Sequence, residues 1–121
     1  MRKSFRMTFR NAELWVSSFD GLGGDGELIR KRCEEDLEVV RRPSSPSLIL
    51  LTFFGTVLSD DFAQLIAGGL AGVGPHVRKA AFCGLDRQGK GAVRKALKAQ
   101  KNISFVAGLF DETEEAKEWL L

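Results

Sequence analysis

SLILLTFFGTVLSDDFAQLIAGG, residues 47–69, joins a continuous apolar run to a segment rich in alanine and glycine. The apolar run at 48–54 has the length of one β-strand, and its lack of alternation is typical of a strand that is buried on both faces. Residues 60–73 then predict a helix, which Gly74 and Pro75 would end. A fully buried strand that leads directly into a helix indicates an α/β fold with parallel strands.

Three polar residues, Ser59, Asp60 and Asp61, separate this strand from the helix. The Ser59 hydroxyl can accept a hydrogen bond from a free N–H group of the first turn. Asp60 and Asp61 would lie in that turn, where the helix dipole favours negative charge. Adjacent residues point about 100° apart around a helix, which is a poor arrangement for a shared metal ion or an acid–base pair. We therefore predict helix capping here, and neither a catalytic residue nor a metal site.

The same alternation of strands and helices continues on both sides of this stretch. Short apolar or alternating runs predict strands, and runs with apolar residues at helical spacing predict helices. The first two strands would form a hairpin with Asn11 and Ala12 at its turn. The remaining predicted strands are 6–10, 13–19, 77–85 and 103–110, and the remaining helices are 27–42, 87–101 and 112–121. The order β-β-α-β-α-β-α-β-α predicts one α/β domain over residues 1–121, with a mixed, mostly parallel five-stranded sheet whose antiparallel first strand lies at an edge.

Composition and targeting signals indicate an ordinary globular domain. The 121 residues are 44% hydrophobic and 28% charged, with a net charge of +2, which is compatible with a single core. The basic N-terminus lacks the apolar region of a secretory signal, and the longest apolar run is too short to cross a bilayer. Cys33 and Cys83 show no metal-binding spacing, so we predict free thiols and a cytoplasmic location.

Two glycine-rich loops resemble nucleotide-binding motifs. GLGGDG at 21–26 matches G-x-G-x-x-G between a strand and a helix. The following strand ends without the acidic residue that would hold a ribose, so a flexible turn with Asp25 at the helix start is preferred. GLDRQGKG at 84–91 matches G-x-x-x-x-G-K, and Asp111 follows a later apolar strand. Gly91 stands where a P-loop needs Ser or Thr for Mg²⁺, so we predict no NTPase and no cofactor.

The second of these loops and the helix after it offer an alternative binding site. Free N–H groups at the helix start, together with the Lys90 ammonium, could hold an anion. The helix also has a basic stripe that suits an acidic partner, a lipid headgroup or nucleic acid. No aromatic residue interleaves the stripe, which disfavours single-stranded nucleic acid. The alternative prediction is a site at 84–94 for an anionic small molecule, a nucleotide or a lipid headgroup, formed by Gly84, Gly89, Lys90 and Arg94.

The helix predicted at 60–73 carries no charged residue after Asp61. Glycines inside a helix cost about 1 kcal/mol each relative to alanine, so a compensating gain is expected. A flat, uncharged face that another surface can approach closely would supply it. The residues expected to pack on the sheet are Phe62, Leu65, Ile66 and Val73, and those on the opposite face are Gln64, Ala67, Gly68 and Ala71.

The order of elements, the strand and helix at 47–69 and the closing FDETEEAKEWL at 110–120 are similar to those of a known family. On these features the chain resembles the STAS domains (sulfate transporter and anti-sigma-factor antagonist), specifically the SpoIIAA-like group, over nearly its whole length. The resemblance implies a non-enzymatic regulatory domain that docks a protein partner, or a second copy of itself, through the loop and helix at 56–72. The docking residues would be Ser59, Asp60, Asp61, Gln64, Ala67, Gly68 and Ala71.

In the anti-sigma-factor antagonists, a loop with Asp-Ser-Ser/Thr-Gly precedes the second helix, and the partner kinase phosphorylates its serine. The corresponding residues here read Ser59-Asp60-Asp61-Phe62. Asp60, at the place of the phosphoacceptor, cannot be esterified in this way, and Phe62 replaces the glycine. The resemblance therefore implies docking without the serine phospho-switch.

Overall fold

The computed structural model describes residues 3–73 and 75–121 and has the element order predicted from the sequence. The strands are β1 (Phe5–Phe9), β2 (Ala12–Ser18), β3 (Leu48–Thr52), β4 (Lys79–Cys83) and β5 (Val106–Phe110). The helices are α1 (Gly26–Val40), α2 (Asp60–Val73), α3 (Arg87–Ala99) and α4 (Thr113–Leu120). The α/β prediction is confirmed, and the ends of the elements differ from the predicted ends by at most three residues.

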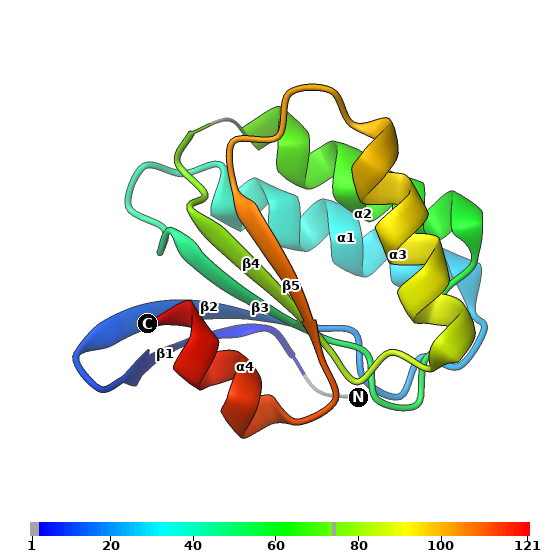
Figure 1. The fold of residues 1–121 in the computed structure, drawn as a ribbon, viewed down its shortest axis with the longest axis horizontal. Helices are drawn as coiled ribbons and strands as arrows, with labels where there is room; N and C mark the ends of the chain where they lie inside the picture. Colours follow the sequence, from blue (N-terminus) through cyan, green and yellow to red (C-terminus); the bar gives the residue numbers. More distant parts are fainter. Residues whose placement is uncertain (1–2, 74) are drawn as a thin grey trace.

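The strands are arranged in the order of the chain. The sheet runs β1-β2-β3-β4-β5, with β1 antiparallel to β2 and the other pairs parallel. Each crossover from β2 onward steps to the next strand in one direction, and crossovers of the usual right hand then place α1, α2 and α3 on one face. Figure 1 shows these three helices together on one face of the sheet and α4 on the other. The predicted antiparallel strand at the edge is confirmed.

The β1–β2 hairpin turns at Arg10 and Asn11, one residue before the predicted turn at Asn11 and Ala12. Both turn residues have positive φ, 48° for Arg10 and 70° for Asn11. A two-residue turn of this type matches the right-handed twist of the flanking strands, and asparagine adopts it readily. Phe9 and Ala12 consequently form the last cross-strand pair of the hairpin.

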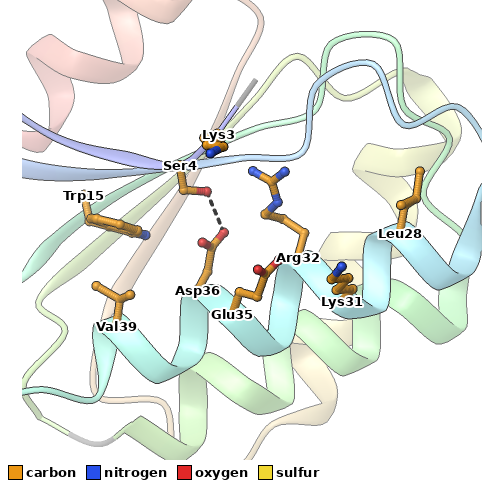
Figure 2. A pocket seen from close by; sticks show the side chains of 9 residues that line it. All are labelled: Lys3, Ser4, Trp15, Leu28, Lys31, Arg32, Glu35, Asp36 and Val39. Carbon is orange, nitrogen blue, oxygen red and sulfur yellow. Dashed lines mark hydrogen bonds between the residues drawn. The ribbon is translucent and has the colours of Figure 1, made fainter. Parts of the chain in front are cut away.

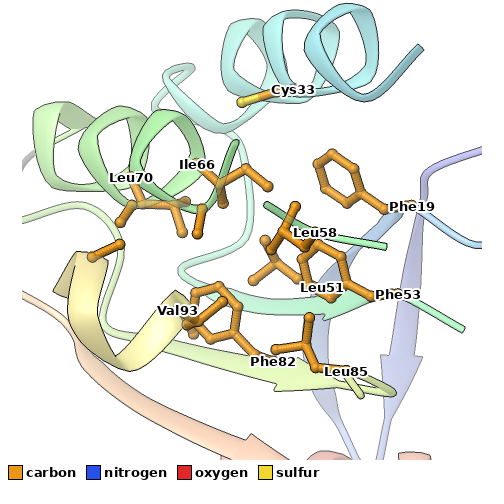
Figure 3. Packing of buried hydrophobic residues seen from close by; sticks show 14 of the residues in the cluster. Phe19, Cys33, Leu51, Phe53, Leu58, Ile66, Leu70, Phe82, Leu85 and Val93 are labelled. Carbon is orange, nitrogen blue, oxygen red and sulfur yellow. The ribbon is translucent and has the colours of Figure 1, made fainter. Parts of the chain in front are cut away.

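The core has two parts, one on each face of the sheet. On the face that α1, α2 and α3 cover, the rings of Phe19, Phe53 and Phe82 form a stack with centroids 5.0 Å and 6.2 Å apart (Figure 3). On the other face, Leu50 of β3 and Leu120 of α4 belong to one apolar cluster. β3 contributes to both parts, as its unbroken apolar sequence predicts.

α2 is the middle helix of its layer and contacts α1 on one side and α3 on the other. Ala67 is only 1% exposed and belongs to the core, so its predicted place on a free helix face is wrong. A Cβ atom on Gly69 would overlap the Leu37 side chain of α1. A Cβ atom on Gly68 would lie 3.5 Å from the Gln100 side chain at the end of α3. The close packing expected for the uncharged face of α2 is therefore provided by α1 and α3 of the same chain.

Replacing two glycines of α2 by alanine separates helix propensity from helix packing. At Gly72 an added Cβ meets no atom within 4 Å, so Gly72→Ala should raise the free energy of unfolding by up to about 1 kcal/mol. Gly69→Ala gains the same propensity but must displace Leu37, and overpacking of this kind costs about 1–3 kcal/mol. Urea unfolding should therefore find Gly69→Ala less stable than Gly72→Ala by at least about 1 kcal/mol. Equal stabilities would contradict the close packing of α1 on α2.

Candidate functional site

Two loops at the carboxyl ends of β2 and β3 are joined by a short ladder of backbone hydrogen bonds. Gly21 N donates to Phe54 O at 2.8 Å, and Gly23 N donates to Gly55 O at 2.9 Å. Val57 N donates in turn to Gly23 O at 2.7 Å. The glycine-rich loop after β2 is therefore an ordered turn, fixed against the loop after β3, rather than the flexible turn predicted from the sequence.

Thr56 ties the same two loops through its side chain. Its hydroxyl accepts a hydrogen bond from Leu22 N at 3.0 Å and donates one to Phe19 O, and the residue is buried. Asp25 then caps α1, as predicted, by accepting a hydrogen bond from Leu28 N at 3.3 Å. These hydrogen bonds fix the backbone of both loops, so the exposed side chains of the loops project from an ordered backbone.

Phe54 and Val57 project from this ordered backbone into solvent. Phe54 is 42% exposed and Val57 is 51% exposed, although large apolar side chains are usually buried. The Phe54 ring lies over Gly84, where an added Cβ would be 2.8 Å from the ring carbons. Gly84 also has a φ of +83°, so this position needs glycine both for its backbone conformation and for space. The ring is thereby held in place while part of it stays open to solvent.

The start of α2 adds polar groups beside these apolar side chains. Ser59 caps the helix as predicted, because its hydroxyl accepts a hydrogen bond from Phe62 N at 3.4 Å. Asp60 and Asp61 are exposed in the first turn, and the Asp60 carboxylate lies 3.6 Å from the Lys95 ammonium of α3. The exposed residues Phe54, Val57, Ser59, Asp60, Asp61 and Gln64 are called the 54–64 surface below.

The rest of the predicted docking face lies further along α2 and is less accessible. Gly68 and Ala71 are partly exposed, whereas Ala67 is buried. The burial follows from the central position of α2, because its two flanks are covered by α1 and α3. The accessible part of the predicted face is therefore the loop before α2 and the beginning of the helix.

The alternative anion site at the start of α3 is already filled by carboxylates of the chain. The Asp86 carboxylate caps α3 and accepts a hydrogen bond from Gly89 N at 2.7 Å. The Lys90 ammonium forms an ion pair with the Asp111 carboxylate at the end of β5. An incoming anion would have to compete with both carboxylates at close range, so we do not propose an anion site here.

The other two residues predicted for this site do not converge on it. Gly84 N donates its hydrogen bond to Phe110 O at 3.2 Å, within the sheet edge. Arg94 is exposed one helical turn beyond Lys90. Lys90 of the 84–91 loop and Asp111, which together suggested a P-loop-like site, are thus brought together by the fold, but their charged side chains pair with each other.

A cleft that the sequence reasoning missed lies between the β1–β2 hairpin and α1. Its volume is about 430 Å³. Figure 2 shows Ser4 and Trp15 on the strand side, facing a row of α1 side chains that includes Arg32 and Asp36. We call this space the Trp15 cleft, and its lining residues are Lys3, Ser4, Trp15, Leu28, Lys31, Arg32, Glu35, Asp36 and Val39.

Asp36 is the centre of a hydrogen-bond network in this cleft. The residue is 6% exposed, and its Oδ2 accepts hydrogen bonds from Ser4 Oγ at 2.9 Å and from Ser17 Oγ. Ser4 Oγ also accepts a hydrogen bond from Ser18 N at 3.0 Å. Burial raises the pKa of the Asp36 carboxyl, although the two serine hydroxyls and the Arg32 guanidinium oppose this shift. One carboxyl thus ties the N-terminal segment to both β2 and α1.

Trp15 and Arg32 complete the polar lining. The Trp15 Nε1 is buried and has no hydrogen-bond partner within residues 3–73 and 75–121. Arg32 is 8% exposed, which is rare for a guanidinium group. Ile29 and Cys33 precede Asp36 at helical spacing, so a charged residue on the apolar stripe of α1 was the available signal in the sequence.

Cys33 and Cys83 are free, as predicted, and both are buried. Burial raises the pKa of the Cys33 thiol to about 11 and also raises the pKa of Cys83, so both thiols are protonated at neutral pH. Among the residues that the structure describes, no group of three or more metal-ligating side chains gathers. In that same part of the chain, no helix combines the length and the apolar character needed to cross a membrane.

Comparisons of the chain with protein-family models, with curated proteins and with solved structures find no match. A function has to be inferred from the two features described above, the 54–64 surface and the Trp15 cleft.

The raised pKa of Asp36 predicts a pH dependence of stability. Because the folded state holds the Asp36 proton more tightly than the unfolded state, the stability from this group is present below pH 3.8 and is lost as pH rises through the folded-state pKa. Asp36→Asn removes the charge and keeps an oxygen that can accept the serine hydrogen bonds. Urea unfolding should show the free energy of unfolding of the variant rising relative to that of the native chain as the pH increases from below 3.8 to neutral.

The matched control for this prediction is Gln88→Asn, which changes an exposed side chain and leaves every titratable group in place. Its stability should differ from that of the native chain by a constant amount between acid and neutral pH. A parallel course for Asp36→Asn as well would show that the Asp36 carboxyl titrates normally in the folded protein.

Proposed function

We propose that the protein is a non-enzymatic interaction domain that docks a protein partner through the 54–64 surface. The observation that carries this proposal is the exposure of Phe54 and Val57, 42% and 51%, on loops whose backbone is held by hydrogen bonds. Exposed apolar side chains that are close in the sequence and rimmed by polar residues are typical of protein–protein contact sites.

The firm backbone under these side chains supports a binding role. Binding costs less conformational entropy when the contact residues are already ordered. The ladder between the loops after β2 and β3, together with the packing of Phe54 on Gly84, orders them before a partner arrives. An aromatic ring presented in this way is the kind of residue that dominates the binding energy of interfaces.

The charges around the surface indicate the chemistry of the partner. All four helices begin at or near the carboxyl edge of the sheet, and acidic residues cap or begin them. The partner is therefore a protein with an apolar depression for Phe54 and basic residues around it, because opposite charges guide association and fix orientation. The acidic residues at this edge are Asp20, Asp25, Glu27, Asp60, Asp61, Asp86, Asp111, Glu112, Glu114 and Glu115.

The resemblance to STAS domains of the SpoIIAA-like group supports the same surface. In that family the loop before the second helix carries the docking role, and here that loop is residues 53–59. Asp60 stands where the resemblance places the phosphoacceptor serine, and Asp61 follows it in the first turn of α2. A carboxylate keeps its negative charge without a kinase, so we propose that docking does not depend on phosphorylation.

The double variant Phe54→Ser, Val57→Ser tests the proposal. The tagged native chain and the variant are compared as baits in a lysate of the source organism, with captured proteins quantified by mass spectrometry. At least one protein should bind the native chain and lose about tenfold or more in recovery with the variant, because the apolar contact is gone. Hydrogen exchange on the isolated complex should then protect residues 54–64.

The matched control is Val106→Ser, which removes an exposed valine, 59% exposed, at the outer strand β5. It should capture the same protein as the native chain. The proposal is overturned if the double variant retains every captured protein, or if protection falls outside the 54–64 surface. Sedimentation of the native chain alone distinguishes self-association, in which case the captured partner is a second copy.

A further inference from the structure

We propose that the Trp15 cleft binds a small organic acid, a molecule with one carboxylate, a flat apolar body and a second oxygen that can accept a hydrogen bond. The cleft shares no residue with the 54–64 surface. The inference therefore stands apart from the docking function and is tested separately.

The size and shape of the cleft suit a small molecule. Its volume of about 430 Å³ falls within the range of ligand pockets, roughly 300–1,000 Å³. It follows α1 from Leu28 to Val39, a distance of roughly 16 Å along the helix axis. An elongated molecule with one ring and a short acidic arm can lie in such a groove, with aliphatic side chains at both ends.

Trp15 supplies an unused hydrogen-bond donor. Its Nε1 is buried and has no partner among the described residues, which is unusual because buried indole N–H groups are normally paired. In Figure 2 the indole nitrogen points toward the space between Trp15 and Asp36. An acceptor oxygen of a bound molecule would satisfy this donor, and the indole face would cover its flat apolar body.

The charges of the cleft select an acid. Lys3 comes from the strand side and Lys31 and Arg32 come from α1, so cations approach the space from two directions (Figure 2). The acidic side chains in the lining are Glu35 and Asp36, and the Asp36 carboxyl already accepts hydrogen bonds from two serine hydroxyls. The cleft therefore has one more cationic than acidic side chain in its lining, and the exposed Lys31 ammonium can pair with the carboxylate of a bound molecule.

The probe for the test is 4-hydroxyphenylacetate, and its neutral counterpart is 4-hydroxyphenylacetamide. Trp15 fluorescence reports binding in the Trp119→Phe background, which leaves Trp15 as the only tryptophan. The acid should quench or shift this fluorescence saturably, with a Kd below about 1 mM, and the amide should bind about tenfold more weakly. Backbone amide NMR shifts should map to the residues that line the cleft.

Two substitutions locate the site without disturbing the core. Lys31→Glu reverses an exposed cation at the cleft and should weaken binding of the acid by about tenfold or more, whereas Lys98→Glu reverses an exposed cation outside it and should not. Trp15→Phe keeps an apolar ring but removes the N–H donor, and its binding, followed by NMR, should also weaken. The fold of each variant is checked by its amide spectrum.

The proposal is overturned if the acid gives no saturable change, if acid and amide bind equally, or if Lys98→Glu weakens binding as much as Lys31→Glu does. The Phe54→Ser, Val57→Ser variant should bind the acid with native affinity, so loss of docking and loss of ligand binding can be told apart.

Discussion

Burial of β3 on both faces is the constraint on which the rest of the structure depends. Ile49 and Leu51 belong to the core under α1, α2 and α3, while Leu50 belongs to the core under α4. A strand of this kind needs a neighbour on each side and a layer on each face to be removed from water. The helix that follows it, α2, is then enclosed between α1 and α3, which explains why it is rich in glycine and alanine and carries no charge beyond its first turn.

The same architecture explains why a cleft opens beside α1. The three crossover helices lie over the parallel strands that they connect, but β1 is added by a hairpin and brings no helix with it. The sheet face of β1 beside α1 is therefore left to side chains alone. Asp36, Ser4 and Ser17 bridge part of the gap with hydrogen bonds, and the remaining space is the Trp15 cleft. A buried carboxyl is stable here only because hydroxyl donors from two other segments reach it.

Much of the fold could be predicted from the sequence because strand and helix periodicities are local properties. The apolar run at Leu48–Thr52, the capping Ser59 and the order of the elements along the chain all follow from short-range patterns. The order of the strands within the sheet does not follow from these patterns and comes from the structure. The environment of a small or polar residue is not local. The sequence around Ala67 is compatible both with a free helix face and with a position between two helices. The burial of Asp36 depends on Ser4, which lies 32 residues away in the chain. The pairing of Lys90 with Asp111 likewise requires the end of β5 to lie beside the start of α3, which are distant in the sequence.

The two proposed sites are physically connected, yet the contacts between them argue for independent function. Gly26, at the start of α1, packs against Phe62 in the first turn of α2, where an added Cβ would lie 2.6 Å from the ring. Leu28, two residues further on, lines the Trp15 cleft. Coupling between two sites requires an element with two arrangements whose balance both sites shift. The hydrogen bonds at Gly23 and the hydrogen bonds of Asp36 hold the chain in defined positions on both sides of this contact. A ligand in the cleft would therefore bind to segments that are already ordered. Occupancy of the cleft is therefore expected to add a binding activity to the domain without altering the docking surface.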